Sequence, residues 1–217
     1  MALGAGGIDP SIPISILSLC VSAIALFLEQ LRPPRISIVA GPLIQLYYPS
    51  DGGFGVYLPI TFLNRAAKTG TVSRCGITLY QRSNPEERFF MEWRYFVSLG
   101  RGQGSNLATN LDEAAHALAV PGKSDVPKMI WFSWRAESKP EVHIVEGQYV
   151  LLVHYWTRST RKPKFERHEF HVDAKTQAEL DSYRANHKST IVNLGLDRET
   201  GENQVLTSVE SQRQLGV

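Results

Sequence analysis

The chain has 217 residues, of which 43% are hydrophobic and 20% charged, so it can form one large domain or two small ones around a buried core. The formal net charge of +2 is too small to indicate a nucleic-acid-binding protein by itself. Cys20 and Cys75 lie in an apolar run and in a predicted strand, so we expect no disulfide.

An uncharged apolar run from Ile12 to Leu28 dominates the N-terminal region. A membrane-spanning helix needs about 17–25 such residues, so the run lies at the short end of that range. No Lys or Arg precedes the run, which disfavours a cleaved secretory signal, and Leu19 stands before Cys20 where a lipoprotein signal needs a small residue. A helix in the core of a soluble domain would have one apolar stripe, whereas this run is apolar nearly all round.

We therefore predict an uncleaved transmembrane helix within an anchor and linker that comprise residues 1–34. Arg32 and Arg35 follow the apolar run closely. The positive-inside rule then predicts a single-pass membrane protein whose C-terminal domain is cytoplasmic. A cleaved signal, a lipoprotein and a soluble core helix remain the alternatives.

Small residues form one stripe along the predicted helix: Ser15, Ser18, Ser22 and Ala25. Steps of three, four and three residues place them on one face. Because small residues let helices in lipid approach closely, this stripe is the predicted packing face of a homo-oligomer. A chance spacing of small residues is the alternative.

Short apolar or alternating segments with turn residues between them fill residues 35–172, a pattern typical of strands. Gly41-Pro42 breaks the first segment, and Pro59 indicates an edge or irregular position in the second. A long connection follows residue 99, with a short helix predicted near 111–117. The predicted strands are 35–48, 54–64, 71–82, 88–99, 127–134, 148–156 and 164–172. They predict a mainly β fold, an antiparallel immunoglobulin-like β-sandwich.

Three stretches of this region resemble bacterial membrane-anchored immunoglobulin-like β-sandwich domains of unknown function. They are "ITFLNRAAKTGTVSRCGITLY" (60–80), "VPGKS" (120–124) and "VEGQYVLLVHY" (145–155). The resemblance implies the fold and a tyrosine-corner role for Tyr149. It implies no function, because one fold can carry many functions.

Residues 173–217 follow the predicted sandwich as a third region. Asp173 is a suitable N-cap for a C-terminal helix over 173–189, which has an apolar patch around Leu180. For the next segment we predict a hairpin with Gly201 in its turn, and for the last residues a mobile tail.

The sequence contains no complete motif for catalysis, for a cofactor or for a metal. "GRGQGSN" (100–106) has Ser105 where a dinucleotide-binding loop needs Gly. His168 and His171 would point to opposite faces of one strand, so they would not bind the same metal ion. Cys75 is expected to be a small buried residue rather than a nucleophile. We therefore predict no cofactor, no metal and no catalytic residue.

Basic residues gather around the turns predicted for one end of the sandwich: Arg65, Lys68, Arg158, Arg161, Lys162 and Lys164. These turns share the end at which the anchor enters an immunoglobulin-like domain, so the patch is predicted to face the membrane or to bind another anion. Trp156 lies in the same stretch, and aromatic residues beside basic ones can bind nucleic acid. The small net charge means that we do not expect a nucleic-acid partner.

These observations predict a single-pass membrane-anchored interaction or scaffold module with no catalytic activity of its own. It would hold an unknown protein partner, or a second copy of itself, at the membrane. The alternative is an oligomeric ligand-sensing membrane effector whose soluble β domain binds an unknown small molecule in the 100–126 region. A third hypothesis is an enzyme whose site is assembled from loops that the sequence does not bring together.

Overall fold

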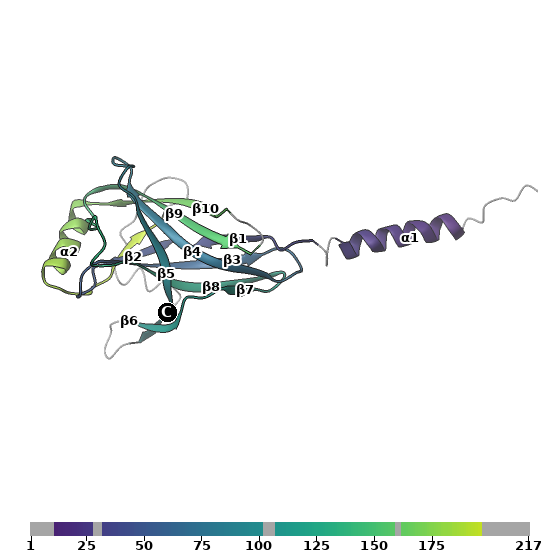
Figure 1. The fold of residues 1–217 in the computed structure, drawn as a ribbon, viewed down its shortest axis with the longest axis horizontal. Coiled ribbons are helices and arrows are strands. Elements are labelled where there is room, and N and C mark those ends of the chain that lie inside the picture. The colour runs from purple at the N-terminus through teal and green to yellow at the C-terminus, as the bar shows by residue number, and fades with distance from the viewer. Residues whose placement is uncertain (1–10, 28–31, 102–106, 159–161, 197–217) are drawn as a thin grey trace, which may run out of the picture.

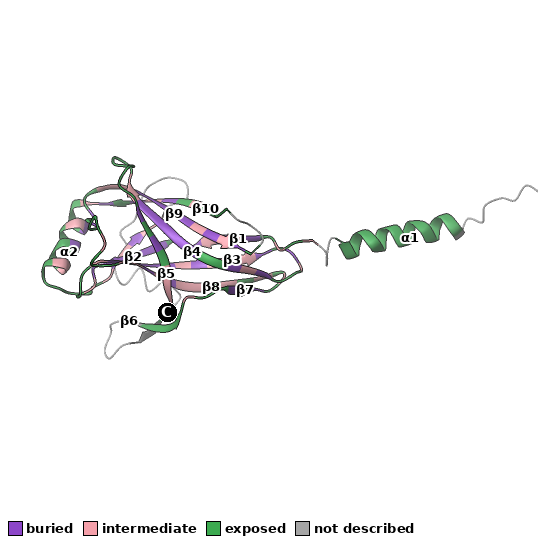
Figure 2. Cartoon of the chain, viewed as in Figure 1, coloured by how far each residue is buried: buried purple, intermediate pink, exposed green. Residues whose placement is uncertain are grey.

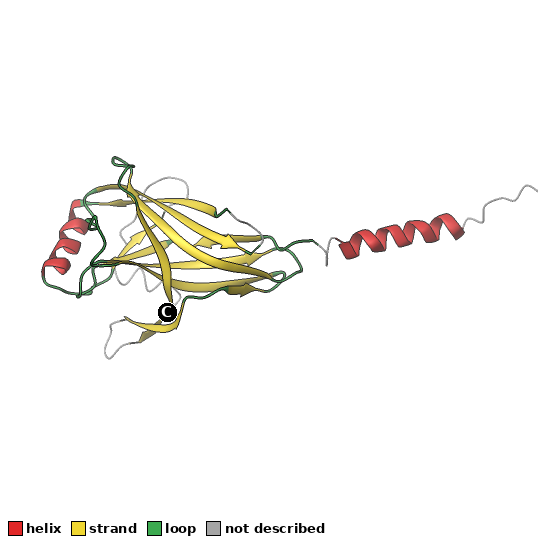
Figure 3. Ribbon diagram, in the orientation of Figure 1, coloured by secondary structure: helices red, strands yellow, loops and turns green. Residues whose placement is uncertain are grey.

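A computed structural model describes the chain except for residues 1–10, 28–31, 102–106, 159–161 and 197–217 (Figure 1). The described residues form helices α1 (Ser11–Leu26) and α2 (Ala174–Ala185) and eleven strands (Figure 3). The strands are β1 (Ile36–Ala40), β2 (Leu43–Tyr47), β3 (Phe54–Asn64), β4 (Gly70–Gln81), β5 (Phe89–Arg101), β6 (Leu107–Ala114), β7 (Leu118–Val120), β8 (Ser124–Trp134), β9 (Gly147–Thr157), β10 (Lys164–Val172) and β11 (Val192–Gly195).

Every predicted strand is present, with the first one split at Gly41-Pro42 into β1 and β2 as its sequence indicates. The short helix predicted near 111–117 is wrong, because β6 and β7 occupy that region. Strand β11 lies in the segment of the predicted C-terminal hairpin. Gly201 and the predicted tail lie outside the described residues.

The strands form one continuous antiparallel sheet rather than two separate ones. Its order is β10-β9-β4-β5-β8-β3-β2-β11, with β1 beside β3, β6 beside β5 and β7 beside β4. Strand β5 joins the two halves, because Met91 pairs with Ile77 of β4 while Phe96 pairs with Ile130 of β8. The sheet curls around its core until β10 approaches β11. The protein is mainly antiparallel β, but the predicted immunoglobulin-like sandwich with a transmembrane helix is wrong.

Helix α1 overturns the predicted membrane anchor. It comprises 16 residues, which span about 24 Å at 1.5 Å per residue, against about 30 Å for the hydrocarbon core of a bilayer. No helix in the described ranges is both long enough and apolar enough to cross a membrane. The predicted anchor in residues 1–34, the single-pass membrane localisation and the cytoplasmic orientation derived from them are therefore wrong. The prediction rests on the apolar run from Ile12 to Leu28, of which Leu28 lies outside the described residues.

Figure 2 shows buried residues along the strands of the curled sheet, and in β1 they alternate with partly buried ones. The largest fully buried ones are five phenylalanines from four strands: Phe54, Phe62, Phe96, Phe132 and Phe170. Two of these, Phe54 and Phe62, come from opposite ends of β3, and Phe132 comes from the neighbouring β8. One apolar core therefore holds both halves of the sheet together.

Two tyrosine hydroxyls fix the connection between β8 and β9. The hydroxyl of Tyr149 accepts a hydrogen bond from the N–H of Val145 at 2.9 Å, which is the contact that a tyrosine corner makes. The hydroxyl of Tyr48 donates to the carbonyl of Val142 at 3.3 Å and accepts from the N–H of Ile144 at 3.0 Å. Burial raises the pKa of Tyr48 to about 12, so this hydroxyl keeps its proton at neutral pH. The connection is thereby held against the end of β2.

Helix α2 lies at the end of the sheet opposite α1 (Figure 1). Its N-cap is Asp173, as predicted, whose carboxylate accepts a hydrogen bond from the N–H of Thr176 at 2.7 Å. A hydrogen bond from the Thr176 side chain, and after it this N–H, lower the pKa of Asp173 below its usual value. Leu180 is buried against the core, and the side-chain oxygen of Gln177 accepts from the N–H of Glu146 at 2.7 Å. These contacts join α2 to the connection that precedes β9.

Replacing Tyr48 with Phe removes its hydroxyl and leaves the N–H of Ile144 without its acceptor. An unsatisfied buried donor costs about 1–3 kcal/mol, so we expect Tyr48→Phe to lower the free energy of unfolding by about that amount. Urea unfolding followed by tryptophan fluorescence measures the change. Tyr80→Phe is the control, because the Tyr80 hydroxyl has no hydrogen bond within the described residues and its ring keeps its contact with Arg88. Equal losses in both variants would contradict the role given to Tyr48.

Cys75 in β4 is fully buried, and burial raises the pKa of its thiol to about 12. Because the thiolate is the reactive form, we expect Cys75 in a Cys20→Ser variant to react with a thiol-exchange reagent at about pH 8 only after unfolding. Absorbance of the released chromophore in native and denaturing buffer measures the reaction. A Cys20→Ser, Cys75→Ala variant gives the background, and a rapid reaction of the native protein would show that the thiol is accessible.

Candidate functional site

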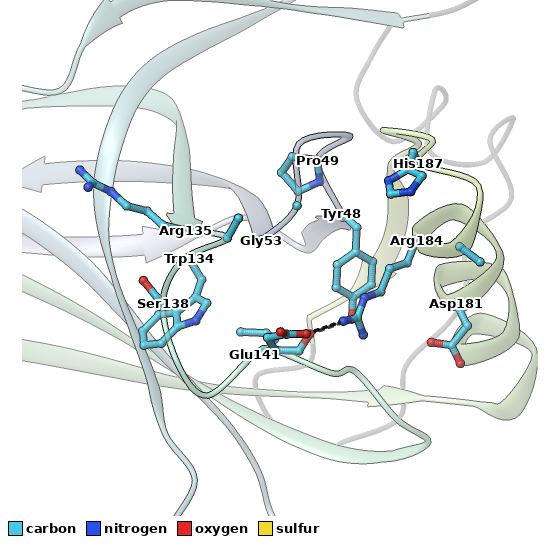
Figure 4. A pocket seen from close by; sticks show the side chains of 14 residues that line it. Tyr48, Pro49, Gly53, Trp134, Arg135, Ser138, Glu141, Asp181, Arg184 and His187 are labelled. Carbon is cyan, nitrogen blue, oxygen red and sulfur yellow. Dashed lines mark hydrogen bonds and ion pairs between the residues drawn. The ribbon is translucent and has the colours of Figure 1, made fainter.

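A pocket of about 510 Å³ lies at the end of the sheet where α2 packs (Figure 4). Its walls come from the end of β2 with the following turn, from the end of β8 with the following connection, and from the C-terminal half of α2. Cavities of about 300–1,000 Å³ with a few convergent polar groups are typical of small-molecule sites. Its lining includes Tyr48, Trp134, Glu141, Val142, Asp181 and Arg184.

Arg184 of α2 is the central cation of this pocket. Its Nη2 donates to Oε2 of Glu141 at 2.9 Å, and its Nη1 contacts the ring of His143 at 2.6 Å. The guanidinium carbon lies 5.4 Å from the centre of the Tyr48 ring, and Figure 4 shows the two side chains against each other. The Arg184 side chain is only 33% exposed, so these contacts hold it in place.

The two carboxylate oxygens of Glu141 contact two different cations. Oε1 accepts from Nζ of Lys139 at 2.5 Å, and Oε2 accepts from Arg184. Lys139, and to a smaller extent Arg184, hold the pKa of Glu141 below its usual value, so it is ionised at neutral pH. Lys139 does not line the pocket. Glu141 therefore has one charge partner inside the pocket and one outside it.

Glycine lets the turn between β2 and β3 approach the end of β8. Gly52 and Gly53 have φ of +95° and +86°, a conformation that side chains disfavour. A Cβ atom on Gly53 would collide with the carbonyl oxygen of Trp134. The indole N–H of Trp134 donates to the carbonyl of Pro140 at 3.0 Å, so its polar atom is satisfied within the protein. What Trp134 adds to the pocket is therefore apolar surface.

The other charged residues of the lining differ in their orientation. Figure 4 shows Arg135 pointing away from the Arg184–Glu141 pair, and its Nη1 lies 3.5 Å from a carboxylate oxygen of Glu137. Asp181 lies on the other side of Arg184 from Glu141 in the same view. Within the described residues Asp181 accepts one long hydrogen bond from a side-chain amide of α2, at 3.4 Å, and pairs with no cation. The pocket thus offers one guanidinium and two carboxylates beside aromatic surface.

The predicted basic residues lie at the opposite end of the sheet, beside the start of β1. Tyr155 of β9 and Lys164 of β10 both donate to the carbonyl of Ile36, at 3.3 and 3.4 Å, and Asn64 at the end of β3 pairs with Ile36. The turns after β3, β7 and β9 therefore converge there. We call this surface the basic end; it comprises Arg32, Arg35, Arg65, Lys68, Lys123, Arg158, Lys162 and Lys164.

Two parts of the predicted patch need correction or qualification. Arg161 lies outside the described residues. The membrane-facing interpretation was based on the predicted anchor, which is wrong, and it stays an untested prediction. Anion binding by the basic end stays a prediction.

Helix α1 exposes apolar side chains on all its sides. Its large apolar residues are 52–71% exposed: Ile12, Ile14, Ile16, Leu17, Leu19, Val21, Ile24 and Leu26. The predicted packing face of Ser15, Ser18, Ser22 and Ala25 lies on the same helix and is also exposed. Contiguous apolar surface of this extent marks an interaction site in a folded protein.

No local pattern in the sequence predicts the pocket. Tyr48, Glu141 and Arg184 come from segments that lie at least 43 positions apart, and none of them stands in a recognisable motif. The small-molecule site was predicted for 100–126, but no described residue of that region lines the pocket. The usable signal was Gly52-Gly53, which indicates a close approach of the backbone to another element.

The other predicted chemical motifs do not contribute to this pocket. His168 is buried and His171 is exposed, so they do lie on opposite faces of β10. Within the described ranges, no group of three or more His, Cys, Asp or Glu side chains could hold a metal ion. Most of the "GRGQGSN" stretch, including Ser105, lies outside the described residues.

Comparison with known proteins gives no family. No family model matches the chain, and no curated protein matches it. Two similar solved structures are the sporulation control protein Spo0M from Bacillus subtilis and a family 123 glycoside hydrolase from Clostridium perfringens. Both are 9% identical to this chain, with TM-scores of 0.31 and 0.33, over 66% and 64% of it. The matched parts cover 50% and 27% of those chains, and similarity at this level does not indicate a function for this protein.

Proposed function

We propose that this protein is an interaction module that assembles with further copies of itself through α1. The observation that carries the proposal is the exposure of large apolar side chains on every side of that helix. Burial of one such side chain contributes about 1.5–3 kcal/mol, whereas association costs about 4–15 kcal/mol. Eight of these side chains together can therefore support a stable assembly. The proposal assigns no catalytic reaction to the protein.

A second copy is the partner that suits this helix. No charged residue lies between Ser11 and Leu26, so α1 lacks the charges by which a different protein would be selected. The small residues of the predicted packing face leave room for another helix, and a second copy presents the same face in return.

The basic end gives the assembly a characteristic salt dependence. Arg32 and Arg35 follow α1 closely, so parallel packing of two helices brings cations of the two copies together. Salt screens such repulsion, with a Debye length of about 10 Å at 0.1 M. Added salt therefore strengthens self-association, whereas it would weaken an assembly held by opposite charges.

Replacing Ala25 with Leu tests the packing face. Ala25 belongs to the stripe, and a larger side chain there keeps two helices apart. We expect Ala25→Leu to weaken the association free energy by about 1–3 kcal/mol, the usual cost of overpacking. Sedimentation velocity over a series of protein concentrations measures the change.

Ala23→Leu is the matched control for this experiment. Each residue turns the helix by about 100°, so Ala23 lies about 200° around the helix from Ala25. The same substitution there should leave the pairing face intact. A wild-type protein that stays monomeric up to about 100 μM at high salt would overturn the proposal.

In the same proposal, the basic end binds an acidic segment of a partner protein. Its eight cations come from the start of β1 and from three turns, and Asp125 is an acidic residue nearby. Complementary charge of this kind accelerates association and selects the partner. This second contact leaves α1 available for self-association, because the two surfaces consist of different residues.

Substituting four cations of the basic end with Gln should weaken binding to a fluorescent oligoglutamate peptide. We expect the Arg65→Gln, Lys68→Gln, Arg158→Gln, Lys162→Gln protein to lose at least about fourfold in affinity, because each exposed ion pair contributes about 0.2–1 kcal/mol. Fluorescence anisotropy at low salt measures the dissociation constant. The control changes the net charge equally, by Gln substitution of Arg82, Arg88, Lys175 and Lys188, which lie outside the basic end. Equal losses in the two proteins would show that only net charge matters.

A further inference from the structure

We infer that the pocket beside α2 binds a free α-amino acid with an apolar side chain. The ligand carboxylate would be held by Arg184 and its ammonium by Asp181, with the side chain against Tyr48 and Trp134. This inference goes beyond the proposed self-association, because the pocket lies beside α2 and α2 is at the opposite end of the sheet from α1 (Figure 1). It rests on the free hydrogen-bonding capacity, the charges and the apolar surface of the lining.

Arg184 supplies a preorganised binding group for a carboxylate. A guanidinium has five N–H donors, and Arg184 uses two of its donors on Glu141 and His143 within the described residues. Three donors are left for a ligand. The contact with the Tyr48 ring holds the guanidinium in position before the ligand arrives, which reduces the entropy lost on binding.

Glu141 makes room for the ligand carboxylate without losing all of its charge partners. It shares its carboxylate between Arg184 in the pocket and Lys139 outside it, at 2.9 and 2.5 Å. If the ligand takes more of the guanidinium, Glu141 keeps its contact with Lys139. The exchange therefore leaves no carboxylate of the protein unpaired.

Asp181 selects a ligand that also carries a positive charge. Its carboxylate is exposed in the lining and has no cationic partner among the described residues. A ligand with a carboxylate alone would approach both Asp181 and Glu141 and be repelled by them. A ligand with an ammonium group alone would be repelled by the positive charge of Arg184. A zwitterion satisfies both signs of charge at the same time, and a free amino acid is the smallest common zwitterion of this kind.

The apolar part of the pocket fits an apolar side chain. Tyr48 directs its hydroxyl into the β8–β9 connection and Trp134 directs its indole N–H to Pro140, so neither polar group is available to the pocket. Val142 extends this apolar surface. The volume of about 510 Å³ lies within the range of small-molecule sites.

Isothermal titration of the full-length protein with L-phenylalanine tests the inference. The matched ligands are 3-phenylpropionate, which lacks the ammonium, and 2-phenylethylamine, which lacks the carboxylate. We expect L-phenylalanine to bind at least about tenfold more tightly than either of them. If 3-phenylpropionate binds as tightly as L-phenylalanine, the role given to Asp181 is overturned. If 2-phenylethylamine does, the role given to Arg184 is overturned. No heat of binding with about 10 mM L-phenylalanine would overturn the site itself. These ligand comparisons use only the wild-type protein, so they do not depend on the folding of a variant.

Two variants that each remove one charge then test which residue binds which group of the ligand. Asp181→Asn and Arg184→Gln should each weaken binding of L-phenylalanine by at least about tenfold. Arg135→Gln is the control, because Arg135 borders the pocket but points away from the Arg184–Glu141 pair, and its affinity should stay within about twofold of wild type. Wild-type affinity in Asp181→Asn would overturn the role of Asp181. A loss of affinity in Arg135→Gln equal to that in Arg184→Gln would overturn the orientation of the ligand.

Discussion

Strands β3 and β8 pair along their whole length, and this ladder fixes where both candidate surfaces lie. At one end Phe54 pairs with Trp134, next to the turn and the connection that form the pocket. At the other end Asn64 pairs with Ser124, next to turns of the basic end. Eleven antiparallel pairs at about 3.4 Å per residue separate these ends by about 35 Å. A shift of register by one residue would turn the core side chains outward, so the separation is tied to the stability of the fold.

Local irregularities in the sequence fit together where this ladder meets its other neighbours. Pro59 lies in the middle of β3, a central strand, although proline cannot donate to a ladder. The break between β1 and β2 falls opposite it, and the N–H of Gly41 donates to the Pro59 carbonyl at 2.7 Å. A Cβ atom on Gly41 would lie 2.6 Å from the Pro59 ring. Gly41, Pro42 and Pro59 therefore act together where the chain passes from β1 to β2.

Local patterns in the sequence indicate features that depend on neighbouring residues, but not features that depend on residues far apart in the chain. The period-two alternation and the Gly41-Pro42 break predicted the strands, and Asp173 predicted the start of α2, because each signal is local. Strand β6 has exposed residues in succession, such as Leu111, so it lacks the alternation that identifies a strand. Strand β5 pairs in both halves of the sheet, and this depends on the strands that flank it. The pocket depends on contacts of Arg184 with residues far from it in the chain, so no local pattern indicates it.

If the protein assembles through α1 and binds a ligand in the pocket, as we propose, the separation of the two ends lets both occur together. Helix α1 leaves the sheet at the basic end, and Figure 1 shows it extending away from the strands. In an assembly held by α1, the pockets therefore lie at the far ends of the copies, away from the shared helices. Because Tyr48 and Trp134 are anchored within their own sheet, each pocket is complete in a single copy. Ligand affinity should then be independent of protein concentration, whereas a pocket completed by a neighbouring copy would bind more tightly as the protein assembles.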